Sequence, residues 1–380
     1  MNEWNVMKKA IVLFSALCVA FVASAANTWY VDDDNYNASG DGNSAAAAFG
    51  TIQEAVNAAS TGDTVKVLPG MYDKGVTYDG YMNSRVVATN KVLTVESTEG
   101  KEVTHIVGAH TTDVSGYGED AIRCIFARPP TGGKVKFIGF TIRDGQAKAD
   151  TSADPSGMGG SLNAGNQNYT VYLIDCTVKN CRASRGAGML GGCAVRTLFV
   201  GNKNLYAHGG IATSAALYNC IGTGCTLSGQ PALQGCFAVN CTFFGNYNGS
   251  MASSYSLFRN CLLTMNGTPA LGSGPYRDLR HCVLAGSYSG EVSTDYGIDG
   301  FDGFVADVPS RQMLAPALGD LRPMAGTAAA ASRNMRGGCW RRWRNCGRTS
   351  SWDSNGRSGR GSRRLWICRT CFPPSKAFRR

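Results

Sequence analysis

The fold is decided by three segments that repeat one another: Tyr218-Asn219-Cys220-Ile221, Val239-Asn240-Cys241-Thr242 and Arg259-Asn260-Cys261-Leu262. Their cysteines, with Cys282 after them, are spaced 21, 20 and 21 residues apart. A fixed spacing of this size indicates a repeat architecture, in which each unit stacks on its neighbours. The period is therefore structural.

The same pattern continues upstream, so that six units share it. Cys176 lies in a matching segment, and Phe140 occupies the equivalent place 36 residues earlier. The residue before this column is of a type enriched at positive φ, which predicts a left-handed turn in every unit. Those residues are Gly139, Asp175, Asn219, Asn240, Asn260 and His281. Two places after the column, a mostly apolar set shares its face, as a strand requires: Ile142, Val178, Gly222, Phe243, Leu263 and Leu284.

The unit length selects the architecture. A strand, a kink and a second strand within 20 to 22 residues are too short for a βαβ unit, which needs roughly 30 residues. The Leu-x-x-Leu-x-Leu framework of leucine-rich repeats is missing. An all-β, single-stranded parallel β-helix remains, in which equivalent side chains stack about 4.8 Å apart. Forty-eight glycines and a charged fraction of 17% suit such a chain, which we expect to form one long domain.

The N-terminus has the features of an export signal. Lys8 and Lys9 precede the apolar run 10–22, and Ala23-Ser24-Ala25 supplies small residues for cleavage before Ala26. The run is too short for an ordinary membrane span. We therefore expect a signal peptide over 1–25, a secreted or cell-surface protein, and no transmembrane segment after cleavage.

A capping helix is predicted next. Thr51 and Glu54 form a capping box, and an apolar stripe of helical period follows, formed by Ile52, Ala55, Val56 and Ala59. Gly62 is expected to end this helix, and a short strand over 64–68 to follow it. An amphipathic helix of this kind covers the exposed end of a solenoid.

The stretch from Trp29 to Tyr72 resembles the opening of secreted right-handed parallel β-helix proteins of the pectin-lyase-like superfamily. It carries Tyr30-Val31-Asp32, then Thr51-Ile52-Gln53, and then Gly62-Asp63-Thr64-Val65 with Pro69-Gly70. The resemblance implies right-handed coils and a choice among polysaccharide lyases, glycoside hydrolases, esterases and non-catalytic surface proteins, because fold alone does not fix function. We expect a cap with the first coil over 26–72, the β-helix over 73–310 and a closing segment over 311–332.

Candidate lyase residues lie at one edge of successive coils. Cleavage by elimination needs a base for the proton α to a carboxylate, and a cation, commonly Ca²⁺, to stabilise the developing charge. Arg143 and Lys179 are the candidate catalytic residues, with Arg182 and Arg185 near them. The polar loop from Asp144 to Tyr169 supplies the candidate Ca²⁺ ligands Asp144, Asp150 and Asp154. The competing interpretation, which we favour, is that these are solvated turn and loop residues.

Other patterns are less specific. His208 lies in a Gly-rich turn but lacks the partner motifs of a glycoside hydrolase. A set of one histidine and three carboxylates (His110, Asp113, Glu119 and Asp120) matches no compact metal motif, and a second set (Asp32, Asp33, Asp34 and Asp41) is better placed for Ca²⁺ although Asp is also a common turn former. The cysteine column lacks CxxC pairs, so we expect mostly reduced, buried thiols. A second column, Cys181 and Cys225 with Asn246, Asn266 and Ser287, predicts another turn ladder.

The last segment, 333–380, departs from the pattern. It contains thirteen Arg and one Lys against one Asp, whereas the whole chain carries +10. Three interpretations stay open: a reading frame shifted after about Ala331, a disordered tail, and a nucleic-acid-binding tail, which we rank last.

Taken together, the sequence predicts an exported monomeric β-helix that engages extracellular or cell-surface polysaccharide. No complete catalytic constellation can be assembled from it. A lyase acting on acidic glycans and a non-catalytic adhesin or structural surface protein are the alternatives.

Overall fold

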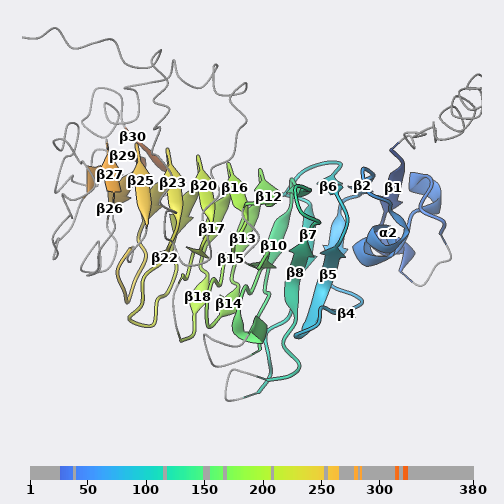
Figure 1. Cartoon of the computed structure of the whole chain (residues 1–380), viewed down its shortest axis with the longest axis horizontal. Helices are drawn as coiled ribbons and strands as arrows, with labels where there is room; N and C mark the ends of the chain where they lie inside the picture. The colour runs from blue at the N-terminus through green and yellow to red at the C-terminus, as the bar shows by residue number, and fades with distance from the viewer. Residues whose placement is uncertain are drawn as a thin grey trace, which may run out of the picture.

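The computed structural model describes residues 26–36, 40–113, 118–148, 155–165, 169–206, 209–251, 256–264, 278–280, 283–284, 313–315 and 320–323. These residues form a right-handed parallel β-helix, seen as an elongated stack of coils in Figure 1. The predicted signal peptide and basic tail lie outside the described residues, as do Cys282 and His281. In the described part of the chain, no helix is long and apolar enough to cross a membrane.

Each coil contributes strands to three long sheets, which we call sheets A, B and C. Sheet A runs β1 (Thr28–Val31), β2 (Thr64–Val67), β6 (Leu93–Ser97), β9 (Val135–Ile138), β12 (Val171–Ile174), β16 (Cys193–Val195), β20 (Ala216–Tyr218), β23 (Phe237–Val239), β25 (Leu257–Arg259) and β27 (Asp278–Arg280). Sheet B runs β3 (Gly70–Tyr72), β7 (Thr104–Val107), β10 (Thr141–Arg143), β13 (Thr177–Lys179), β17 (Leu198–Val200), β21 (Ile221–Thr223), β24 (Thr242–Phe244), β26 (Leu262–Thr264) and β28 (Val283–Leu284). Sheet C runs β4 (Thr77–Tyr78), β5 (Asn83–Thr89), β8 (Arg123–Arg128), β11 (Leu162–Asn163), β15 (Met189–Leu190), β19 (Ala212–Thr213) and β22 (Leu233–Gln234).

The described residues also form smaller elements. Strands β14 (Arg182–Ala183) and β18 (Lys203–Asn204) pair in parallel between sheets B and C. The antiparallel pairs are β4 with β5 and β29 (Met313–Ala315) with β30 (Asp320–Pro323). Three 3₁₀ turns are η1 (Asp33–Asn35), η2 (Ala45–Ala47) and η3 (Pro155–Gly157).

The predicted kink column connects sheet A to sheet B. Gly139, Asp175, Asn219, Asn240 and Asn260 all have φ between 53° and 76°, which confirms the left-handed turn at each of them. The structure adds a coil that the sequence did not reveal. In that coil Arg196 takes the kink position at φ 51°, and Thr197 takes the place of the cysteine.

The cysteine column points inward, as predicted. Cys176, Cys220, Cys241 and Cys261 are buried free thiols. Each Sγ contacts the carbonyl two residues before it and a carbonyl of the preceding coil, for example Tyr218 and Ala194 at 3.4 Å from Cys220. The hydroxyl of Thr197 donates in the same way to Leu173 at 3.3 Å and Val195 at 3.2 Å. The ladder is therefore a hydrogen-bonding position as well as a packing position.

The predicted apolar face on sheet B is also inward. Ile142, Val178, Phe243 and Leu263 are fully buried, with Phe199 from the additional coil between them. Gly222 takes its place in this ladder because a Cβ there would lie 2.7 Å from Ile211 Cδ1 and 2.8 Å from Phe243 Cδ1. A large side chain in one coil thus requires a small one in the next.

The second predicted ladder alternates two residue types. Cys181, Asn202, Cys225 and Asn246 are all buried, and the structure adds Asn202 to the predicted set. The Asn246 side chain accepts from the Cys225 amide at 3.0 Å and donates to the Gly222 carbonyl at 3.1 Å. Asn266 and Ser287 lie outside the described residues.

Helix α2 (Ile52–Ala58) covers the first coils at one end of the stack (Figure 1). The predicted capping box is present, since the Thr51 hydroxyl accepts from the Glu54 amide and the Glu54 carboxylate accepts from the Thr51 amide at 2.8 Å. The predicted apolar stripe is buried against the coil. Gly62 does not end the helix; the last helical residue is Ala58, and Gly62 sits at φ 103° in the turn before β2.

Candidate functional site

The structure places Arg143 and Lys179 side by side. They end β10 and β13 and are partners in the register of sheet B. Because Ile142 and Val178, one residue earlier, point into the core, both basic side chains point outward. Their catalytic role stays a prediction, but their adjacency is a consequence of the coil register.

Asp144 is engaged by its neighbours. The Asp144 backbone adopts a left-handed conformation at φ 58°. Its carboxylate pairs with Arg143 at 2.7 Å and accepts from Asn180 Nδ2 at 2.5 Å. Both carboxylate oxygens therefore already have donors. Asp150 and Asp154, the other predicted Ca²⁺ ligands, lie outside the described residues, so this set of ligands stays a prediction.

The basic character continues around the corner of the coil. After the turn at Asn180, Arg182 in β14 is the register partner of Lys203 in β18. The next residue in each strand is buried, so Arg182 and Lys203 face outward. We call Arg143, Lys179, Arg182 and Lys203 the cationic corner. Arg185, also expected near this edge, follows in the same coil, and burial lowers its pKa.

Three members of the cationic corner have no acidic partner in the described part of the chain. The ion pairs found there include Arg143 with Asp144 but none to Lys179, Arg182 or Lys203. Arg182 and Lys203 lie in adjacent coils, about 4.8 Å apart, and Lys179 precedes Arg182 in the same coil, on the other side of the turn at Asn180. Such an array attracts a polyanion and is screened by salt.

His110 approaches the same corner. Its Nε2 lies 2.7 Å from the Asn180 carbonyl, which can only accept, so this nitrogen carries the proton and Nδ1 keeps a lone pair. Burial and the charge of Arg182 lower the pKa of His110, although the contact with Asn180 and the charge of Asp144 act in the opposite direction. The imidazole is therefore neutral near pH 7.

Asp120 and Glu119, two of the carboxylates grouped with His110 in the sequence, bind other side chains and backbone groups instead. Asp120 accepts from Thr111 and from the Thr112 amide at 2.8 Å, and these hydrogen bonds lower its pKa to about 2. Glu119 pairs with Lys148 at 2.6 Å. In the described ranges, these residues do not form a group that could hold a metal.

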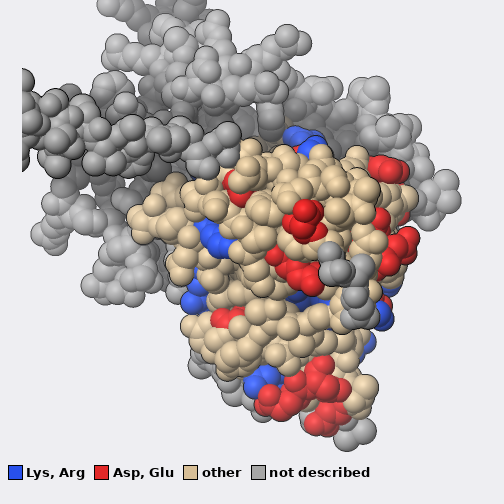
Figure 2. All heavy atoms as spheres, turned by 90° about the vertical axis from the view of Figure 1, so that its right-hand side faces the viewer, with Lys and Arg blue, Asp and Glu red and all other residues tan. Residues whose placement is uncertain are grey.

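The acidic residues of the cap do come together. Asp32, Asp33 and Asp34 can bring one oxygen each within 4.8 Å of one another, but Asp41 is not among them. One oxygen of Asp33 already accepts from the Met71 amide at 2.8 Å. Figure 2, which looks onto the capped end, shows Asp and Glu gathered there in several patches. This end of the molecule thus differs in charge from the cationic corner.

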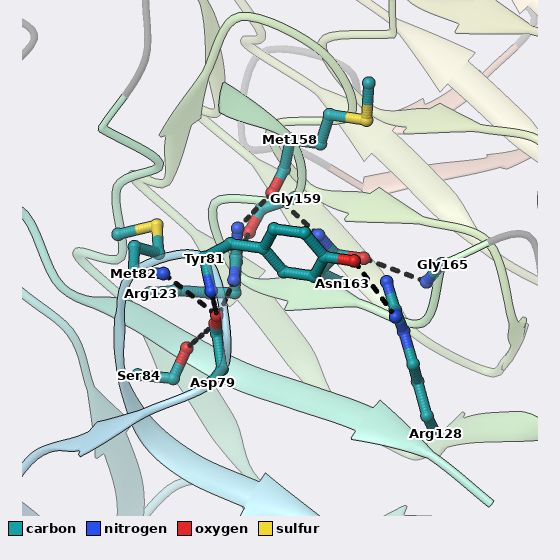
Figure 3. Close-up of polar contacts among 10 residues, drawn as sticks. All are labelled: Asp79, Tyr81, Met82, Ser84, Arg123, Arg128, Met158, Gly159, Asn163 and Gly165. Atoms are coloured by element: carbon teal, nitrogen blue, oxygen red, sulfur yellow. Dashed lines mark hydrogen bonds and ion pairs between the residues drawn. The ribbon is translucent and has the colours of Figure 1, made fainter. Parts of the chain in front are cut away.

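A second polar cluster lies on the outer face of sheet C and was missed in the sequence (Figure 3). It contains Asp79, Tyr81, Arg123, Arg128 and Asn163. Arg123 and Arg128 belong to β8, a strand whose other residues are apolar and buried. Two arginines within such a strand are a signal that could have been noticed, because a buried charge needs a partner.

Comparison with known proteins gives a likeness in fold. No protein-family model and no curated protein matches the chain. A pectin methylesterase in complex with a hexasaccharide is 14% identical, with a TM-score of 0.46, and covers 79% of this chain and 99% of its own. Pectin methylesterase PemA from Erwinia chrysanthemi is 13% identical, with a TM-score of 0.41 and the same coverage. A rhamnogalacturonan lyase is 13% identical, with a TM-score of 0.42, and covers 68% of this chain and 74% of its own.

Proposed function

We propose that this chain is an exported protein that binds an acidic polysaccharide along the cationic corner. The observation that supports this most is the group formed by Lys179, Arg182 and Lys203, which face outward from two adjacent coils without acidic partners in the described part of the chain. A polysaccharide with a carboxylate on each sugar presents several negative charges close together, which can contact this group of positive charges. Binding to it gains from several contacts made at once.

The proposal is tested by removing the three free charges together. The variant Lys179→Gln/Arg182→Gln/Lys203→Gln should bind polygalacturonate about tenfold or more weakly, because each exposed charge contributes up to about 1 kcal/mol. Lys66→Gln is the matched control, since Lys66 is also a solvent-facing strand residue but lies on sheet A and is paired with Glu96 at 3.1 Å. Binding of each variant to surface-immobilised polygalacturonate would be measured at low and at moderate salt. Equal affinity for the triple variant and the control would refute the proposal.

A lyase is the second candidate, and His110 favours it. Its neutral imidazole has a free lone pair on Nδ1, and it lies close enough to Arg182 for that positive charge to lower the pKa of His110. Such a base could take the proton α to a sugar carboxylate while the glycosidic C–O bond at the β carbon breaks, and the cations would stabilise the negative charge that develops. Arg143 and Lys179 are the catalytic residues predicted from the sequence.

The lyase hypothesis predicts unsaturated products from acidic polysaccharides. Their ultraviolet absorbance would be followed over a panel of substrates with and without Ca²⁺, for the unaltered protein and for His110→Gln, Arg143→Ala and Lys179→Ala. Loss in His110→Gln alone would identify the imidazole as the base. Binding without cleavage anywhere on the panel would contradict the lyase and leave the non-catalytic, adhesin-like protein.

A further inference from the structure

Arg128 ends β8 on the outer face of sheet C, and two aromatic rings hold its guanidinium. The guanidinium carbon lies 4.6 Å from the centre of the Phe126 ring and 5.2 Å from that of Tyr81. The two rings are themselves 6.0 Å apart. A guanidinium that packs on aromatic rings in this way can still donate hydrogen bonds from its N–H groups.

Few polar groups use those donors. In the described part of the chain, the side chain of Arg128 makes one hydrogen bond, a long one of 3.4 Å to the Tyr81 hydroxyl, and no ion pair. Gly165 packs close to the guanidinium, because a Cβ there would lie 3.1 Å from Nε and 3.3 Å from Nη2 of Arg128. Gly165 also has φ 62°, a conformation that other residues rarely adopt.

The surroundings hold this arrangement in place (Figure 3). Asp79 forms a fully buried ion pair with Arg123 and also accepts from the Tyr81 amide at 2.9 Å, which fixes the start of the segment that carries the Tyr81 ring. On the other side, the Asn163 side chain accepts from the Gly165 amide at 2.8 Å. The position of Arg128 is therefore set before any ligand arrives, which lowers the entropic cost of binding.

From this geometry we infer that Arg128 and Tyr81 form a carboxylate-binding site on sheet C, separate from the cationic corner. The in-plane donors of a guanidinium match the two oxygens of a carboxylate, and a partly desolvated site strengthens that contact. The ring of Tyr81, next to the guanidinium, offers an apolar face and a hydroxyl to the group that carries the carboxylate. An acidic sugar has this combination, and only this identification of the carrier rests on the proposed function.

Site-resolved arginine modification tests the inference. Phenylglyoxal would be applied to the unaltered protein, and modified peptides mapped by mass spectrometry, with and without a galacturonic acid trimer. Arg128 should be protected severalfold by the trimer and not by its methyl ester, which lacks the charge. Arg123, which is fully buried, should stay unmodified throughout and serves as the internal control.

The same map separates this inference from the proposed function. Protection confined to Arg143 or Arg182 would support the cationic corner and overturn the site at Arg128, whereas protection of Arg128 in the triple corner variant would support the site independently. Equal protection by the methyl ester, or stronger protection by dextran sulfate than by the trimer, would overturn the carboxylate assignment. Arg128→Lys keeps the charge but loses the two parallel N–H donors of the guanidinium. It should therefore bind the trimer about tenfold more weakly, in line with a loss of about 1.4 kcal/mol.

Discussion

Replacing Arg123 by Met should destabilise the protein by about 3–5 kcal/mol, the range found when one partner of a buried ion pair is removed. The side chains of Arg123 and Asp79 are both fully inaccessible to solvent. Without the guanidinium, the carboxylate keeps the Ser84 hydroxyl at 2.6 Å but no countercharge. The carbonyls of Met158 and Gly159 also lose donors at 2.7 and 2.8 Å.

The unpaired charge, and not the loss of the attraction itself, should account for most of this effect. Burial lowers the pKa of Arg123 to about 10 in spite of the nearby Asp79, which indicates that the cost of desolvation exceeds the attraction. The double variant Arg123→Met/Asp79→Asn should therefore be more stable than Arg123→Met alone.

Urea unfolding followed by circular dichroism gives the free energies, and hydrogen exchange of amides 77–84 locates the change. Lys66→Gln is the control, because its ion pair with Glu96 is 39% and 31% exposed and should contribute at most about 1 kcal/mol. A cost for Arg123→Met no larger than that of the control, or a double variant less stable than the single one, would refute the role of the unpaired charge.

Three further expectations concern the ladders. Thr197→Val should cost about 1 kcal/mol by removing the hydroxyl that donates to Leu173 and Val195, whereas Thr197→Cys should cost less; urea unfolding compares them. Asn219→Ala, at φ 54°, should cost about 1–2 kcal/mol more than Asn219→Gly, and equal stabilities would contradict the left-handed kink. Burial raises the pKa of Cys225 from 9.0 to about 12, so the stability it contributes is complete below pH 9 and is lost as the pH rises towards about 12; iodoacetamide at pH 8 should label it only after unfolding, and rapid labelling of the folded protein would contradict its burial.

The sequence predicted the coil because its turns use residue types with a strong conformational preference. Asn219 and Asn240 signal positive φ through their type, and their spacing gives the register of sheet B. Arg196 gives no such signal, since arginine has no preference for positive φ. Thr197 also stands where most other coils have cysteine, so the column cannot be followed through this coil in the sequence. That coil was therefore missed, although it obeys the same hydrogen bonding as the others.

The cationic corner and the polar cluster on sheet C differ in how much of each can be predicted from the sequence. Arg143 and Lys179 are neighbours because they occupy equivalent places in consecutive coils, and a repeat fixes such contacts directly. The contact of Tyr81 with Arg128 spans 47 residues and depends on a segment next to β4 that lies over the outer face of sheet C. No periodicity encodes that contact, so only the tertiary structure reveals it.

The carbonyls that help to bury Arg123 occupy ordinary coil positions, although the coil that carries them is long. Consecutive kinks are 20 to 23 residues apart from Asp175 to Asn260, but 36 residues separate Gly139 from Asp175. The register places Met158 opposite Arg185 and Leu162 opposite Met189 of the following, regular coil, so the additional residues lie before Met158 and after Asn163. The carbonyls of Met158 and Gly159, which accept from Arg123, therefore do not come from the insertion. What distinguishes this part of sheet C is the segment next to β4, because Asp79 pairs with the buried Arg123 and fixes the backbone that carries Tyr81 over Arg128. That segment supplies the countercharge that allows a buried arginine in an otherwise apolar strand, and it leaves Arg128 with donors for a ligand.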